Sequence, residues 1–120
     1  MPRYVDGFVI PIKKGKLPAY RRLAAKCGKV WMEHGALAYL ETAGEDLKAP
    51  CGLPFPRLTK VRPGETVLLS FIIYRSRRHR DAVNKKVMAD PRLQSMMGTQ
   101  DMPFDVKRMA YGGFAALVDL

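Results

Sequence analysis

The stretch Thr66-Val67-Leu68-Leu69-Ser70-Phe71-Ile72-Ile73-Tyr74 decides the fold, because it is the clearest strand of the sequence. Most of its side chains are β-branched or aromatic, which is typical of strands. Successive residues of a strand point to opposite faces of a sheet. Both sets are largely apolar here: Val67, Leu69, Phe71 and Ile73 alternate with Leu68, Ser70, Ile72 and Tyr74. The stretch therefore predicts a strand in a sheet that is covered on both faces.

Three more strands are predicted on either side of this stretch. They comprise residues 4–12, 36–43 and about 107–117. In the first and the last of these strands, the residues on both faces are again largely apolar. A polar connection, Gly98 to Phe104, leads into the last strand.

Two helices are predicted between the strands. Apolar residues recur at three- and four-residue steps over 17–34, which indicates one face of a helix, and Gly35 ends that helix. Ser76 is a suitable N-cap for a second helix that runs to residue 90, before a proline. Residues 92–97 add a further helical turn.

The order β-α-β-β-α-β predicts an α+β fold of ferredoxin-like type, with a four-stranded, mostly antiparallel sheet and two helices on one face. The chain of 120 residues fits one domain, 1–120. Residues 44–65 form a long loop insertion that contains four prolines, and loops of this length are usually functional or disordered. Because this loop also contains apolar residues, we expect it to lie on the protein or across a partner subunit.

The helix-free face of this sheet needs a cover that one chain does not supply. Left exposed, it would exceed the apolar patch of roughly a few hundred Å² that monomers tolerate. Packing against a second copy covers it through one two-fold contact. We therefore expect a homodimer formed through this face, and we place Ile72 on it.

Composition restricts the function classes. The net charge of +10 favours anionic partners such as nucleic acid, although most basic residues are scattered along the chain. Cys27 and Cys51 form no CxxC pair, and free thiols indicate a reducing compartment. We find no signal-peptide core and no apolar run of about twenty residues, so we expect a cytoplasmic protein without membrane contact. No nucleotide or metal motif is present, so no cofactor and no metal are expected.

Five stretches carry a family resemblance. They are YVDGFV at 4–9, FIIY at 71–74, RHRDAVN at 78–84, MADPR at 88–92 and, above all, MPFDVKRMAYGGF at 102–114. With them the chain resembles the uncharacterised YbaA-like bacterial family over nearly its whole length. The resemblance implies a dimeric α/β-barrel, in which two sheets face each other across a central cavity. It brings no established function, although some members carry a label that links them to signal-recognition-particle RNA.

Polar residues within apolar strands, and a histidine at a helix end, are the candidates for a site. The candidate ligand-binding residues are Asp6, Tyr39, Tyr74 and Arg108, and the candidate catalytic residues are His34, Glu41 and Arg108. Glu41 or Asp6, paired with Arg108, would hold a small anionic or carbonyl-containing molecule. Glu41 or His34 would move a proton. The alternatives are structural ion pairs at strand ends, exposed polar groups and a packed helix-end histidine. We expect the ligand between the sheet and the long loop.

Three functions remain open at this point. The first is a homodimeric small-molecule-binding protein, which by resemblance to the wider group extends to a cofactor-free monooxygenase or isomerase. The second is an RNA-associated basic protein. The strand at 66–74 lacks the basic, glycine-rich aromatic motif of RNA-recognition sheets, so we expect any RNA binding to be weak and non-specific. The third is a non-catalytic structural or regulatory dimer.

Overall fold

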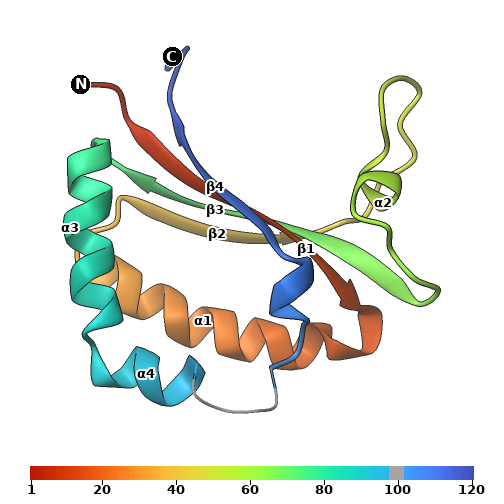
Figure 1. The fold of residues 1–120 in the computed structure, drawn as a ribbon, viewed down its shortest axis with the longest axis horizontal. Helices are drawn as coiled ribbons and strands as arrows, with labels where there is room; N and C mark the ends of the chain where they lie inside the picture. The colour runs from red at the N-terminus through yellow and green to blue at the C-terminus, as the bar shows by residue number, and fades with distance from the viewer. Residues whose placement is uncertain (98–101) are drawn as a thin grey trace.

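The computed structural model describes residues 1–97 and 102–120 and shows a sheet with its longer helices on one side and one short helix near an end of the other side (Figure 1). The four strands are β1 (Tyr4–Lys13), β2 (Ala38–Ala43), β3 (Glu65–Tyr74) and β4 (Ala110–Ala115). The helices are α1 (Leu17–Glu33), α2 (Phe55–Leu58), α3 (Arg77–Met88) and α4 (Pro91–Met97), with single 3₁₀ turns η1 (Lys14–Lys16) and η2 (Val106–Arg108). No helix in the described ranges is both long and apolar enough to cross a membrane.

The sheet has the strand order β2-β3-β1-β4, and every neighbouring pair is antiparallel. β3 lies inside the sheet, paired with β1 along its whole length and with β2 along part of it. Ser70 at its middle is opposite Phe8 of β1 on one side and Glu41 of β2 on the other. The predicted α+β, ferredoxin-like fold is confirmed.

Local signals place the helices as predicted. Pro18 lies in the first turn of α1, where its missing N–H removes no hydrogen bond. Gly35 follows the helix with φ of +113°, a conformation that glycine adopts without strain. The Ser76 hydroxyl accepts a hydrogen bond from the backbone N–H of His79, so Ser76 is the N-cap of α3. Each helix therefore begins or ends at the residue whose chemistry suits that position.

The structure differs from the prediction in several places: α3 ends at Met88 instead of residue 90, β2 begins at Ala38 instead of residue 36, and the last strand and the long loop also differ. The last strand begins only at Ala110, because residues 106–108 form the turn η2, whose start is capped by the Asp105 carboxylate. The long loop 44–65 contains the short helix α2, which we did not predict. Part of the predicted connection from Gly98 to Phe104 lies outside the described residues.

The apolar core lies between the sheet and the helices. β3 contributes Leu68, Ile72 and Tyr74 to it, each at most 3% exposed. Our placement of Ile72 on the helix-free face is therefore wrong. Its side chain lies on the face that the helices cover, and it packs in the core with Val30 and Val83.

The helix-free face of the sheet is apolar across all four strands. Leu40 of β2, Leu69 of β3 and Phe114 of β4 are 48%, 44% and 61% exposed. Between them lie Phe71, at the register position opposite Leu40, and the glycine pair Gly7 and Gly112. The helices α1, α3 and α4 lie on the opposite side of the sheet, and on this side the short helix α2 lies only near one end (Figure 1).

Candidate functional site

A cavity of about 340 Å³ lies between the sheet and α1, and its walls are mainly aromatic and sulfur-containing side chains. The aromatic residues that line it are Phe8, Tyr20, Trp31, Tyr39, Phe71, Phe104 and Tyr111, and the methionines are Met88, Met97, Met102 and Met109. No residue of 44–65 lines this cavity among those described, so it does not lie between the sheet and the long loop, where we expected the ligand.

One end of the cavity holds a carboxylate surrounded by hydroxyl groups. Glu41 Oε1 accepts a hydrogen bond from the Tyr20 hydroxyl at 2.6 Å and a second, short one from Ser70 Oγ. Glu41 Oε2 accepts one from the Tyr39 hydroxyl at 2.6 Å. These four residues, which we call the Glu41 cluster, all line the cavity.

The strand geometry assembles most of this cluster. Tyr39 and Glu41 are two residues apart in β2 and so share a face, and the sheet register places Ser70 opposite Glu41. Gly28 of α1 lies beneath the Tyr39 ring, since a Cβ atom at this position would come within 2.7 Å of that ring. The absence of a side chain at this turn of α1 therefore lets Tyr39 lie flat against the helix and reach Glu41.

The cluster keeps its tyrosines protonated. Burial, followed by the hydrogen bond to Glu41, raises the pKa of Tyr20 well above its usual range. Burial and the negative charge of Glu41 do the same for the pKa of Tyr39. Burial and Glu41 also raise the pKa of Cys27, which lines the cavity, so its thiol is a poor nucleophile.

A second polar group of the cavity is already paired with a cation. Asp6 is buried, and its Oδ1 lies 2.6 Å from Nη1 of Arg80. The Asn84 amide donates to Asp6 Oδ2 at 3.4 Å, and its oxygen accepts hydrogen bonds from the Trp31 indole at 3.0 Å and the Tyr74 hydroxyl at 3.1 Å. This network satisfies the buried polar atoms where α3 meets the sheet.

Arg108 lies away from both carboxylates, and its expected pairing with Glu41 or Asp6 is wrong. Its guanidinium binds Glu65 in a bidentate pair at 2.6 and 2.8 Å and donates to the Lys60 carbonyl. Arg108 reaches Glu65 because η2 turns the chain before β4 begins, so Arg108 precedes that strand instead of opening it. The pair borders a separate hollow that Lys13, Lys16 and Arg62 also line.

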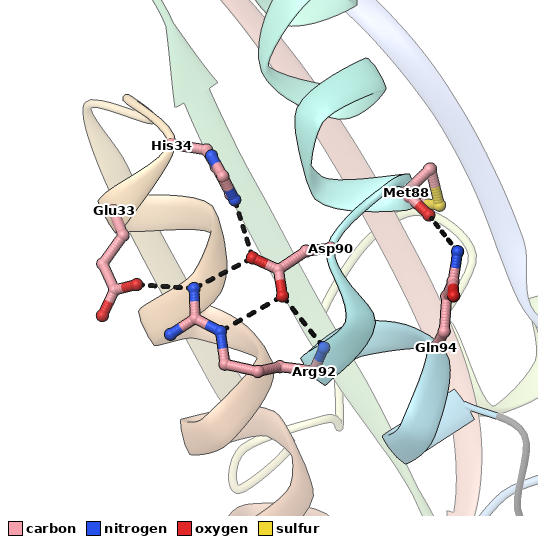
Figure 2. Close-up of polar contacts among 6 residues, drawn as sticks. All are labelled: Glu33, His34, Met88, Asp90, Arg92 and Gln94. Atoms are coloured by element: carbon pink, nitrogen blue, oxygen red, sulfur yellow. Dashed lines mark hydrogen bonds and ion pairs between the residues drawn. The ribbon is translucent and has the colours of Figure 1, made fainter.

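His34 also lies outside the cavity, at the C-terminal end of α1 (Figure 2). Its Nε2 is 2.8 Å from the Asp90 carboxylate, which also binds Arg92, and Arg92 in turn reaches Glu33 at 2.7 Å. The hydrogen bonds from Arg92 and His34 hold the pKa of Asp90 well below its usual range. This junction joins α1 to the turn between α3 and α4, and it matches the alternative of a packed helix-end histidine.

The cavity thus brings together three of the six predicted site residues, Asp6, Tyr39 and Glu41. Tyr74 supports them through Asn84, whereas His34 and Arg108 lie elsewhere. The sequence did not predict Tyr20 as a site residue, because Tyr20 belongs to the apolar face of α1. It did not predict Asn84 either, because no motif or periodicity in the sequence includes this residue. In the described ranges, no group of three His, Cys, Asp or Glu side chains is arranged to hold a metal ion.

The sequence and the fold both have known relatives. Residues 3–106 match the family described as "Protein of unknown function (DUF1428)". The chain is 41% identical over 117 residues to the "Uncharacterized protein YbaA" of Escherichia coli and of Shigella flexneri, with 98% of both chains covered. These matches confirm the resemblance to the YbaA-like family.

Two solved structures have a similar fold. One is a NIPSNAP family protein of unknown function from Agrobacterium tumefaciens, with a TM-score of 0.59, 15% identity and coverage of 96% of this chain and 88% of that chain. The other is an uncharacterised NIPSNAP domain protein from Burkholderia xenovorans, with a TM-score of 0.58, 15% identity and coverage of 97% and 98%. At this identity the likeness shows the fold alone.

Arg108→Ala tests the structural role of the pair with Glu65. The hydrogen bonds from Arg108 and the Arg62 backbone lower the pKa of Glu65 from 4.5 to about 2. Because this pKa is depressed in the folded state, the stabilisation is complete above about pH 4.5 and is lost as the pH falls through about 2. We expect Arg108→Ala to lower the thermal midpoint by roughly 4 °C at pH 7 and by progressively less below pH 4. Arg57→Ala, an exposed change of equal charge, is the control, and a deficit independent of pH would contradict this role.

Proposed function

The chain belongs to the DUF1428 family of proteins of unknown function, and we propose that it is a single-domain homodimer that binds a small, mainly apolar molecule in the cavity between the sheet and α1. The observation that carries this proposal is the cavity itself, with apolar walls and the Glu41 cluster at one end. Ligand sites are typically concave and apolar, measure about 300–1,000 Å³ and contain a few convergent polar groups. The cavity has each of these properties.

The walls of the cavity fit a ligand with a flexible or aromatic body. Met88, Met97, Met102 and Met109 contribute unbranched, polarisable side chains that adapt to the shape of a bound molecule. Aromatic residues from α1, from each of the four strands and from the loop at Phe104 complete the walls. Such walls bind a ligand mainly through apolar contacts and offer few hydrogen-bonding groups, so the ligand carries few polar groups.

A catalytic form of this proposal assigns proton transfer to Glu41. This carboxylate is the cavity group that is free to accept a proton without first breaking an ion pair, whereas Asp6 is bound to Arg80. A cofactor-free isomerase or monooxygenase needs a base of this kind beside a carbon–hydrogen or oxygen–hydrogen bond of its substrate. His34 takes no part in it, because its ring is bound to Asp90 outside the cavity.

An anionic or carbonyl-containing ligand suits the hollow around Arg108 better than the cavity. Lys13, Lys16, Arg62 and Arg108 line this hollow together with the carboxylates of Glu65 and Asp105. Since the Arg108 guanidinium is already paired with the Glu65 carboxylate, an anion would bind mainly to the lysines and to Arg62. We keep this ligand class as the second candidate.

The homodimer is proposed from the apolar helix-free face. Leu69 and Phe114 are about half exposed on a face that extends over all four strands, and the Phe114 ring lies over the glycines at its centre. A second copy is the occupant that the chain always has available, and a two-fold contact covers both faces at once. A purely structural dimer would use the same face with the cavity unoccupied.

RNA association is the remaining alternative, and the outer face of α1 supports it. Arg21, Arg22, Lys26 and Lys29 are all exposed on this helix. They offer phosphate contacts without aromatic stacking partners on the same helix face, because Tyr20 and Trp31, the aromatic residues of α1, line the cavity. We therefore propose that any RNA binding is electrostatic and independent of sequence.

Binding in the cavity is tested with the neutral dye N-phenyl-1-naphthylamine. Its fluorescence should rise on addition of the protein, and the emission of Trp31, the single tryptophan of the chain, should change with it. Ala24→Leu fills the cavity from the buried face of α1, and we expect about tenfold weaker dye binding. Ala25→Leu, on the exposed side of the same turn, is the matched control. Equal affinities of the two variants for the dye would show that the dye binds elsewhere, and would contradict binding in the cavity.

The homodimer is tested with Leu69→Asp, which places a charge on the helix-free face where the side chain is 44% exposed. Light scattering at micromolar concentration should report twice the mass of one chain for the native protein and a single chain for this variant. Met32→Asp, at a side chain that is 45% exposed on α1, should stay dimeric. A native protein that is monomeric under these conditions would show the proposal to be wrong.

RNA binding is tested by fluorescence anisotropy with two unrelated single-stranded RNAs. We expect equal, weak affinities that fall at least tenfold between about 50 and 200 mM salt, because phosphate contacts release counterions. Lys26→Glu with Lys29→Glu should weaken the binding of both RNAs alike. A tight complex with one RNA that persists at about 200 mM salt would contradict electrostatic binding.

A further inference from the structure

We infer that the cavity selects a ligand whose polar group donates a hydrogen bond, and that a hydrophobic amine in its protonated form is the best occupant, held by Glu41. This inference rests on the proposed binding function and narrows it to one class of molecule. It follows from a count of protons and charges in the Glu41 cluster.

The hydroxyl protons of the cluster are all in use. A hydroxyl group has one proton to donate. Tyr20, Tyr39 and Ser70 each direct that proton at Glu41. The polar end of the cavity therefore offers a ligand lone pairs only, and an acceptor such as a carbonyl oxygen has no donor to meet unless one of these bonds breaks.

Glu41 retains room for one more donor. A carboxylate accepts about four hydrogen bonds, two at each oxygen. Oε1 already accepts two, from Tyr20 and Ser70, whereas Oε2 accepts one, from Tyr39. The acceptor position that is left on Oε2 belongs to a side chain that lines the cavity.

The charge of Glu41 is also unmatched. Across residues 1–97 and 102–120, no lysine, arginine or histidine forms an ion pair with this carboxylate. Asp6, the other carboxylate of the cavity, is neutralised by Arg80. A cation in an apolar cavity is stabilised by an opposite charge and by the faces of aromatic rings. Trp31 and Tyr39, with ring centroids 6.2 Å apart, both line the cavity beside Glu41.

The experiment compares four molecules that share one apolar body and differ in the polar group. They are 2-phenylethylamine, 2-phenylethanol, acetophenone and phenylacetate, each used to displace N-phenyl-1-naphthylamine from the protein. We expect the amine to bind about tenfold more tightly than the alcohol, because a charge-assisted hydrogen bond is roughly twice as strong as a neutral one. Acetophenone should bind more weakly than the alcohol, and phenylacetate should not displace the dye.

Two variants locate the preference. Glu41→Gln removes the charge with almost no change in size, and it should bring the amine and the alcohol to within about threefold of each other. Glu45→Gln makes the same chemical change at an exposed site just after β2 and should leave the tenfold preference intact. Ser70→Ala keeps the Glu41 charge and frees one acceptor position on Oε1, so this variant should still prefer the amine to the alcohol. Its result can be obtained even if Glu41→Gln fails to fold.

The outcomes separate this inference from the proposed function. If the dye binds and acetophenone or the alcohol displaces it as well as the amine does, the amine preference is wrong and the binding function stands. If the dye binds and the amine fails to displace it, the inference is again overturned alone. If neither the dye nor any of the four molecules binds, the proposed function fails and the inference fails with it.

Discussion

Everything in this fold depends on one constraint, which is that β3 is apolar on both faces and lies inside the sheet. A strand of this kind requires contact on two sides. On one side, Leu68, Ile72 and Tyr74 pack against helices that arrive from both βαβ halves of the chain. On the other side, Leu69 and Phe71 continue an apolar surface through β2, β1 and β4 that the chain's own helices leave uncovered. The helices therefore determine where a cavity can form within one chain, and the open face determines where a second chain can pack.

The cavity exists because the helix layer does not fill the space over the middle of β3. Ser70 is a small residue at this point, and its neighbours across the register are Glu41 and Phe8. α1 crosses above them with Gly28 against the Tyr39 ring, which occupies the space that a side chain at position 28 would need. The hydroxyl of that ring then bonds to Glu41 instead of reaching solvent. The small residue at position 28 thus admits the ring whose hydroxyl joins the Glu41 cluster, and Ser70 adds a second hydroxyl to that cluster.

Much of the fold could be predicted from the sequence, and much less of the site. The alternation in 66–74 and the three- and four-residue steps in 17–34 report local periodicity, which a strand or a helix shows without reference to the rest of the chain. The grouping of Tyr39 with Glu41 follows from the same two-residue period. Partners that are distant in sequence carry no such signal: Tyr20 meets Glu41 through the angle at which α1 crosses the sheet, and Arg108 meets Glu65 through the turn η2. Predicting which carboxylate an arginine binds requires the positions of both backbones, which periodicity does not supply.

The way Glu41 is satisfied distinguishes it from Asp6, Glu65 and Asp90. Asp6, Glu65 and Asp90 each meet an arginine, and their ion pairs join segments that are distant in sequence or adjacent in the fold. Among the residues that the structure describes, Glu41 joins the same kinds of elements with hydroxyl groups alone. Hydrogen bonds to a charged group are worth about 1.5–3 kcal/mol each, and removing a carboxylate from water costs several kcal/mol, so the two terms roughly cancel. A neutral side chain with an acceptor oxygen, such as glutamine, would still meet hydroxyl donors at position 41 without placing a charge there. The negative charge is therefore best explained by what enters the cavity, because a carboxylate without a cation contributes most when a bound molecule brings the positive charge or the donated proton.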